Sequence, residues 1–162
     1  MSDNYEIDKI DIEILHELMH NAMIPFTEIA QKVGVSPGTI HVRMKKMDNI
    51  GLIKSSHLLV NPGKLGYGIT AFLGVYLDKS SMYDSVVKDL EKIPEIVDCH
   101  YMTGTYSMFV RIICKDTLHL KEILHDKIQQ ISGIDRTETF ISLEESFNRP
   151  MQIDLPKKGN RS

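Results

Sequence analysis

The sequence predicts an α+β protein in which an N-terminal winged helix-turn-helix precedes a C-terminal ferredoxin-like βαββαβ domain. Three observations predict this fold: a three-residue turn between two short helical patterns, a breaker-rich stretch, and alternating strand and helix patterns after it. The 162 residues suffice for two small domains. We therefore expect a helix-turn-helix domain at 1–61, a linker at 62–68, a second domain at 69–155 and a disordered tail at 156–162.

The first helices are expected from hydrophobic spacing and from their caps. Apolar residues recur every three or four positions between residues 7 and 18, which predicts one amphipathic helix ending near Asn21. A second, shorter helix is predicted from Thr27, a good N-cap residue, to Gly34, which ends it.

The turn that follows indicates a helix-turn-helix at about 27–46. Only Gly34, Val35 and Ser36 separate the second helix from a third, which runs to about Asn49. Ser36 followed by Pro37 is a strong helix start, because the hydroxyl accepts an unpaired amide and proline has no amide to leave unpaired. The third helix turns Ile40, Met44 and Met47 inward.

A wing and a boundary are expected next. Short β-prone runs at 52–53 and 57–60 predict a hairpin packed on the three helices. Residues 61–68 are rich in glycine and proline, so we place the domain boundary there.

The second domain shows the pattern of a split βαβ fold. Because both helices cover one face of such a sheet, the other face, which carries apolar side chains from the runs 72–76 and 109–113, would be left wet in a monomer. Sheet-to-sheet dimerisation is therefore expected. The predicted order is a strand at 69–77, a helix at 81–93, strands at 96–103 and 106–114, a helix at 117–131 and a strand at 134–143.

Charge is distributed unevenly although the net charge is only −3. Residues 1–31 hold one Lys and seven acids, a net −6, whereas residues 32–64 hold five Lys, one Arg and one Asp, a net +5. A basic block on one predicted helix indicates a surface that faces phosphates. From charge alone, a helix face that is simply solvated explains the block equally well.

The third helix, placed in a major groove, would offer its N-terminal turns to base edges. Arg43 is then expected to read a base or grip a phosphate, lysines to neutralise phosphates, and Ser36 mainly to cap the helix. The predicted DNA contacts are Ser36, Pro37, Gly38, Thr39, His41, Val42, Arg43, Lys45, Lys46 and Lys54.

Several functional classes find no support in the sequence. No apolar run reaches the length of a membrane helix and the N-terminus lacks a secretory pattern, so the cytoplasm is the expected location. Cys99 and Cys114 form no CxxC pair, which favours free thiols. There is no nucleophile elbow, phosphate loop or dinucleotide fingerprint, so we expect no enzyme and no cofactor.

One short motif points elsewhere. Residues His16 to His20 fit HExxH, in which two histidines bind zinc and Glu17 activates water. A zinc hydrolase is a remote alternative, because the match is short and no third ligand is identifiable. The histidine pair is a better candidate for an accidental metal site than Cys99 and His100, which are adjacent in a predicted strand and would point to opposite faces.

Five motifs in the two predicted domains carry a resemblance to a known family. They are Ile7-Asp8-x-x-Asp11-x-x-Ile14-Leu15-x-x-Leu18, Val35-Ser36-x-x-Thr39-Ile40-x-x-Arg43-Met44-x-x-Met47, Gly51-Leu52-Ile53, Thr103-Gly104-x-Tyr106 and Thr137-Glu138-Thr139. The chain resembles the Lrp/AsnC, or feast/famine, family of transcription regulators, whose C-terminal domain is RAM/ACT-like. Within that family it is most similar to the asparagine-responsive AsnC branch, although many relatives carry Asp where it has Ser107.

The resemblance implies a regulator that binds double-stranded DNA as homodimers, assembles further, often to octamers, and responds to a free amino acid, asparagine being the first candidate. An effector site is expected at Thr103, Gly104, Tyr106, Ser107, Thr137 and Thr139.

Two questions about that site stay open. Tyr106 and Ser107 would point to opposite faces of a regular strand, so a turn or bulge must intervene if both line one pocket. Thr137 and Thr139 are also ordinary strand residues. An amino-acid-binding regulatory module of a metabolic enzyme is the alternative function, but such a module has no use for a basic helix-turn-helix.

Overall fold

The computed structural model describes residues 5–56 and 58–155 and divides into two compact units. One unit contains the residues up to Leu58 together with those from Phe147 onward, and the other runs from Leu59 to Ser146. The segment from Phe147 therefore belongs with the N-terminal unit, whereas the sequence had placed it in the second domain. The tail predicted to be disordered, 156–162, lies outside the described residues.

The N-terminal unit is built from α1 (Lys9–His20), α2 (Phe26–Val33) and α3 (Pro37–Asn49). A capping box between Asp8 and Asp11 starts α1, because each side chain accepts the other residue's amide. Gly34 ends α2 at φ +79°, in the left-handed region that glycine tolerates best, and Ser36 caps α3 through the Thr39 amide. The predicted helix-turn-helix is thus confirmed. Its core contains Ile14, Ile29, Ile40 and Met47, all fully buried.

The start of α2 differs from the prediction. Its N-cap is Pro25, not Thr27, and the Pro25 carbonyl accepts the amides of Glu28 and Ile29. Phe26 packs against the core from the first helical position, so hydrophobic contact draws the helix start two residues earlier. Tertiary packing here outweighs the capping preference of threonine.

The predicted wing is wrong for the described residues of this chain. No strand occurs between residues 50 and 68 in the described part, where the only regular element is the 3₁₀ helix η1 (Pro62–Leu65). Leu58, Leu59 and Val60 are 80%, 79% and 54% exposed. A β-prone run becomes a strand only when its amides find a partner, and none is paired with these residues here.

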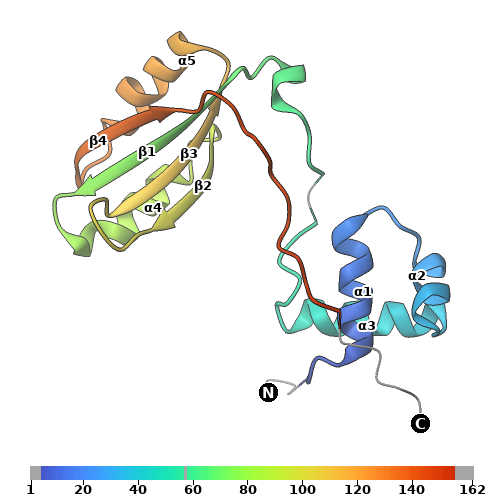
Figure 1. The fold of residues 1–162 in the computed structure, drawn as a ribbon. Coiled ribbons are helices and arrows are strands. Elements are labelled where there is room, and N and C mark those ends of the chain that lie inside the picture. Colours follow the sequence, from blue (N-terminus) through green and yellow to red (C-terminus); the bar gives the residue numbers. More distant parts are fainter. Residues whose placement is uncertain (1–4, 57, 156–162) are drawn as a thin grey trace. The chain divides into compact units, whose positions relative to one another are not determined.

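The second unit confirms the ferredoxin-like expectation. Its four antiparallel strands follow the order β2-β3-β1-β4, and α4 lies behind the sheet in the view of Figure 1. The π-helical turn η3 continues α5. The elements are β1 (Ile69–Leu77), η2 (Ser80–Met82), α4 (Tyr83–Leu90), β2 (Ile96–Tyr101), β3 (Met108–Cys114), α5 (Thr117–Glu122), η3 (Ile123–Ile128) and β4 (Ile134–Ile141).

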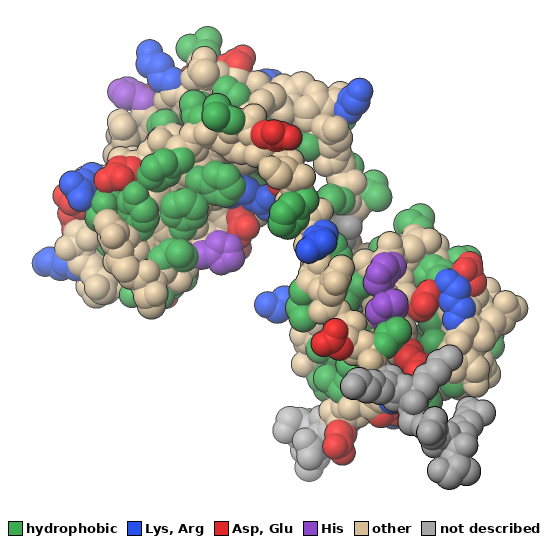
Figure 2. Space-filling model, in the orientation of Figure 1, with side chains coloured by type: hydrophobic (Ala, Val, Ile, Leu, Met, Phe, Trp, Pro, Cys, Tyr) green, Lys and Arg blue, Asp and Glu red, His purple; other side chains and the backbone are tan. Residues whose placement is uncertain are grey.

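The two faces of this sheet have different neighbours. Leu73 and Val75 lie on the face that packs against Leu90 and Ile123 of the helices, and all four are buried. The opposite face carries aromatic rings, which appear in Figure 2 as a group of hydrophobic side chains. Phe72 and Phe109 stack there with ring centroids 5.8 Å apart, and Phe140 is 46% exposed.

No helix in the described part of the chain is long and apolar enough to cross a bilayer.

Candidate functional site

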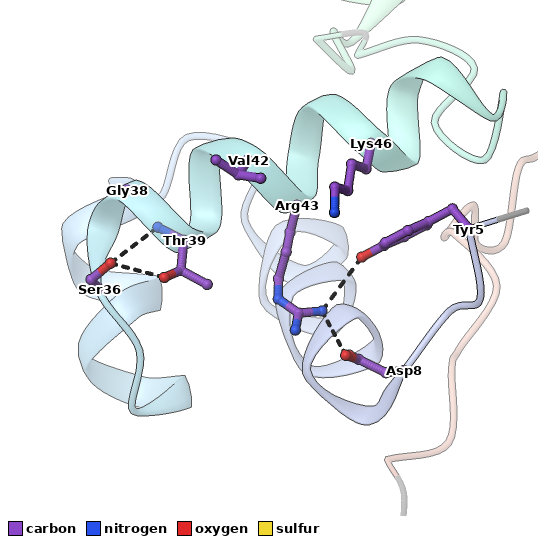
Figure 3. Close-up of a pocket in the computed structure, with 8 residues that line it drawn as sticks. All are labelled: Tyr5, Asp8, Ser36, Gly38, Thr39, Val42, Arg43 and Lys46. Atoms are coloured by element: carbon purple, nitrogen blue, oxygen red, sulfur yellow. Dashed lines mark hydrogen bonds and ion pairs between the residues drawn. The ribbon is translucent and has the colours of Figure 1, made fainter. Parts of the chain in front are cut away.

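An open groove runs along α3 in the N-terminal unit (Figure 3). Its volume is about 610 Å³, and most of its lining comes from residues predicted to contact DNA. Tyr5 and Asp8, from the segment before α1, complete it and were missed by the sequence prediction. The lining residues are Tyr5, Asp8, Ser36, Gly38, Thr39, Val42, Arg43 and Lys46.

The N-terminal turn of α3 presents small groups to this groove. Ser36 Oγ lies 3.1 Å from the Thr39 amide and 2.9 Å from the Thr39 hydroxyl, so the cap fixes both side chains. Gly38 has only Ser36 Oγ near its missing side chain, at 3.8 Å. Pro37 and Val42 are exposed beside them. The backbone of this turn is therefore accessible to a large ligand.

Arg43 has partners that the sequence prediction did not foresee. Its Nη1 atom lies 2.8 Å from Asp8 Oδ2, 2.9 Å from Asp11 Oδ1 and 3.4 Å from the Tyr5 hydroxyl. The arginine side chain is 21% exposed, while the Asp11 side chain is fully buried. Hydrogen bonding to Asp11 raises the pKa of Arg43 further above its usual range. This guanidinium holds α3 against α1, which differs from the predicted contact with a base or a phosphate.

Asp8 and Tyr5, which both face Arg43, have shifted pKa values. Partial burial acts to raise the pKa of Asp8, but the Asp11 amide and the Arg43 guanidinium outweigh it, so the pKa lies below its usual value. Burial and the hydrogen bond to Asp11 raise the pKa of the Tyr5 hydroxyl, which donates to both Asp11 oxygens at 2.8 Å. The cluster thus favours the ionised form of Asp8 beside the arginine.

The remaining predicted DNA contacts lie on the exposed side of the unit. Lys45, Lys46 and Lys54 are exposed, and Lys46 Nζ lies 5.3 Å from the centre of the Tyr5 ring. His41 instead packs edge-on against Phe26 of α2, with ring centroids 4.7 Å apart. Its imidazole therefore helps to fix α2 against α3.

The predicted effector residues split between the two faces of the sheet. Thr137 and Thr139 pair with Val75 and Leu73, so they share the helix-covered face. The Tyr106 ring lies on the opposite face, against Gly74, where a Cβ atom would meet the ring at 2.5 Å. The structure does not bring the two threonines and Tyr106 into one pocket of a single chain.

The β2–β3 turn supplies the irregular backbone that the prediction required. Gly104 has φ +113°, and Thr103 and Gly104 are exposed. Ser107 is used by the fold: its amide donates to the Val75 carbonyl at 2.9 Å, and its hydroxyl accepts the Leu77 amide at 3.4 Å. Thr103 and Gly104 therefore keep polar groups that a ligand can reach.

Glu138 joins the open face and was not predicted as a site residue. Its carboxylate accepts the Tyr106 hydroxyl at 2.8 Å and the Tyr76 hydroxyl at 3.1 Å. The bond from Tyr106 lowers the pKa of Glu138, and the same bond raises the pKa of Tyr106. Arg136 lies over the Tyr76 ring at 4.0 Å. Strand alternation could have indicated Glu138, because it places this residue on the face opposite Thr137 and Thr139.

The HExxH motif lies at the end of α1, and its glutamate is held in an ion pair. Glu17, which would activate water, accepts Lys32 Nζ at 2.8 Å. The described part of the chain contains no group of three His, Cys, Asp or Glu placed to hold a metal ion.

Two family models match this chain over both units. Residues 7–48 match the AsnC-type helix-turn-helix domain, and residues 70–151 match the Lrp/AsnC ligand binding domain. The chain belongs to the Lrp/AsnC family. This member is 40% identical over 150 residues to the regulatory protein AsnC of Escherichia coli K12, a match that covers 93% of this chain and 99% of that protein.

Solved structures agree with this assignment. The structure of E. coli AsnC superposes with a TM-score of 0.82 at 39% identity, covering 91% of this chain and 99% of that one. A feast or famine regulatory protein from M. tuberculosis, complexed with L-methionine, superposes at 0.83 and 22% identity, covering 93% and 100% of the two chains, and supports the fold alone. This Lrp/AsnC protein is a transcription regulator with a DNA-binding helix-turn-helix, and its relatives are regulators rather than known enzymes.

Proposed function

We propose that this protein binds an operator in the cytoplasm as a homodimer, with α3 of each protomer in a major groove. The observation that carries the proposal is the asymmetry of α3. One side, with Ile40 and Met47, is fully buried in the unit. The other side exposes the capped N-terminal turn and then Lys45 and Lys46. A recognition helix needs this combination of an accessible N-terminus and flanking cations.

Within this interface the side chains take different roles. Pro37, Gly38 and Thr39 face base edges, and Gly38 lets the backbone approach closely. Lys45, Lys46 and Lys54 neutralise phosphates. Arg43 acts as a positioning residue, because Asp8 and Asp11 already neutralise its charge and fix its direction.

The effector is an amino acid that binds the C-terminal unit. The match to a ligand binding domain supports this, as does the L-methionine in the M. tuberculosis relative. Asparagine is the first candidate, because the sequence motifs are most similar to the asparagine-responsive branch. Since Tyr106 and Thr137 face opposite ways in one chain, we place the ligand where the β2–β3 turns of neighbouring copies meet, with exposed amides near Gly104 binding its carboxylate.

Assembly follows from the uncovered face of the sheet. Phe72, Phe109 and Phe140 form an apolar surface that stays in contact with water in a monomer. Burying it gains about 25 cal/mol per Å² of apolar area. We propose a dimer through this face, assembling to an octamer. Phe140→Glu should yield a smaller species in sedimentation, whereas Leu118→Glu, on the 63% exposed position of α5, should not.

Fluorescence anisotropy with the DNA upstream of the protein's own coding region tests the function. We expect binding that resists competitor DNA, and an apparent Kd that changes with one of the twenty amino acids, asparagine first. Equal affinity for the upstream DNA and a shuffled duplex would overturn the operator-binding proposal. Specific binding that none of the amino acids alters would overturn the effector proposal alone.

A further inference from the structure

The end of α1 carries two histidines that DNA binding does not use. His16 and His20 lie one helical turn apart, with ring centroids 4.3 Å apart and ring planes inclined by 39°. His20 is exposed and the His16 side chain is 28% exposed. Figure 2 shows a pair of adjacent histidine side chains at the surface of the N-terminal unit. Two imidazoles at this spacing can reach one ion.

The hydrogen bond of the His20 ring leaves one of its nitrogens open. His20 Nδ1 lies 2.7 Å from the His16 carbonyl oxygen, which can only accept, so Nδ1 carries the hydrogen and Nε2 keeps its lone pair. Metal-binding histidines show this pattern, with the second nitrogen oriented by a carbonyl or carboxylate. His16 Nδ1 lies 4.0 Å from Glu17 Oε1, beyond hydrogen-bond distance, so the protein does not fix which nitrogen of this ring binds an ion.

A small pocket adds sulfur to the two imidazoles. Its volume is about 230 Å³, and it lies between α1 and the segment 149–153 of the same unit. Met19 and Met151 both line it beside the histidines. Glu17 does not, because Lys32 holds its carboxylate. Thioethers select copper(I) over harder ions, whereas Ca²⁺ and Mg²⁺ prefer several oxygen ligands, and the amide of Gln152 supplies the one side-chain oxygen among the residues of this lining.

The charge at the pocket opposes a divalent ion more strongly than a monovalent one. Arg149 lines the pocket, and its guanidinium lies over the Phe147 ring with its carbon 5.2 Å from the ring centre. Coulomb repulsion is proportional to charge, so this arginine opposes a divalent ion twice as strongly as a monovalent one.

We propose that His16 and His20 bind one copper(I) ion, His20 through its Nε2 atom, with the thioether of Met19 or Met151 as third ligand. With Met151 as that ligand, binding would link α1 to the segment 149–153. The site is independent of the DNA-binding groove, because none of its residues lines that groove.

Anaerobic titration of the full chain against a chromophoric copper(I) chelator tests this site. We expect one equivalent to be retained, and His16→Gln and His20→Gln each to weaken retention at least about tenfold, since even outer-shell changes cost that much. His125→Gln is the matched control, an exposed histidine paired with Asp126 in η3, and should retain the ion. Anisotropy with operator DNA reports whether each variant is folded.

Two results would overturn the proposal. One is retention that His16→Gln and His20→Gln leave unchanged while DNA binding is intact, which would mean an ion held elsewhere. The other is an X-ray absorption spectrum of the loaded protein with nitrogen but no sulfur around copper, or tighter binding of Zn²⁺ than of copper(I). Sulfur scattering that Met19→Leu or Met151→Leu removes would support the thioether ligand and identify it.

Discussion

Arg43 Nη1 lies 2.9 Å from Oδ1 of the fully buried Asp11, so the recognition helix carries an arginine that is already paired within the protein. This pair joins residues 32 positions apart and ties α3 to the start of α1. A change at Arg43 can therefore weaken DNA binding by destabilising the N-terminal unit, without removing a contact to DNA.

Replacing Arg43 by alanine should destabilise the N-terminal unit. The change leaves Asp11 buried without its cation, which typically costs about 3 kcal/mol or more. Asp11 keeps its bonds from Tyr5 and the Asp8 amide, so we expect the lower end of that range. Urea unfolding followed by circular dichroism measures the loss, with Lys45→Ala as the exposed control on the same helix.

The same variant separates the two roles of Arg43. If Arg43→Ala unfolds like the wild type but loses operator binding, the guanidinium contacts DNA, as the sequence first suggested, and the positioning role is wrong. Loss of stability with binding recovered at low temperature would support the role in positioning α3.

The lysines should account for the salt dependence of DNA binding. Removing a phosphate contact lowers the slope of log Kobs against log salt by about one, without changing sequence preference. We expect this for Lys45→Ala and Lys46→Ala. Lys88→Ala, exposed on α4 of the other unit, should leave the slope unchanged. An unaltered slope for Lys46→Ala would remove that residue from the interface.

The contrast between Arg43 and these lysines shows what the sequence could predict. The helix starts and the Gly34 turn depend on neighbouring residues, so local patterns predicted Ser36 as a cap and, apart from the wing, the order of the helices and strands. The +5 block was also visible, but its pairing was not: Lys32 binds Glu17 and Glu28, and Arg43 binds Asp8 and Asp11. Lys32 and Arg43 are thus neutralised by acids from residues 1–31, most of them distant in sequence.

The errors in the C-terminal unit have a related cause. The sequence assigned apolar side chains of 72–76 and 109–113 to the open face, but it did not separate Phe72 and Phe109, which lie there, from buried neighbours such as Leu73. It also could not show that Tyr106 turns onto that face against Gly74. The prediction of a wing in the N-terminal domain failed for a similar reason, because strand formation depends on a partner strand and not on β propensity alone. Local rules therefore predicted the fold better than they predicted the site.

The C-terminal unit should lose stability in acid through Glu95. Burial acts to raise the pKa of Glu95, but Lys127, at 2.8 Å, and His119 outweigh it and lower the pKa. A carboxyl with a lowered folded pKa stabilises the protein above its ordinary value of 4.5 and loses that contribution as pH falls through the folded value. Thermal unfolding between pH 6 and 3, about the range this titration spans, should show a shallower decline in Glu95→Gln.

The control for this titration is a carboxylate with different surroundings. Glu91→Gln changes an exposed residue at the end of α4 and should leave the pH dependence as in the wild type. Equal slopes for Glu95→Gln and the wild type would show that the contact with Lys127 contributes nothing to stability.

Gly74→Ala should displace the Tyr106 ring. The added Cβ atom would lie 2.5 Å from the ring carbons, so the ring must leave the sheet and Glu138 loses its 2.8 Å hydrogen bond. Overpacking of this kind costs about 1–3 kcal/mol. Tyr106→Ala removes the clash, so Gly74→Ala in that background should cost much less, and a double-mutant cycle by urea unfolding measures the difference. Additive costs would mean that the ring moves freely and that Gly74 is not needed for its position. If the β2–β3 turn forms the effector site, Gly74→Ala should also weaken the response of DNA binding to the amino acid, while leaving DNA binding without effector intact.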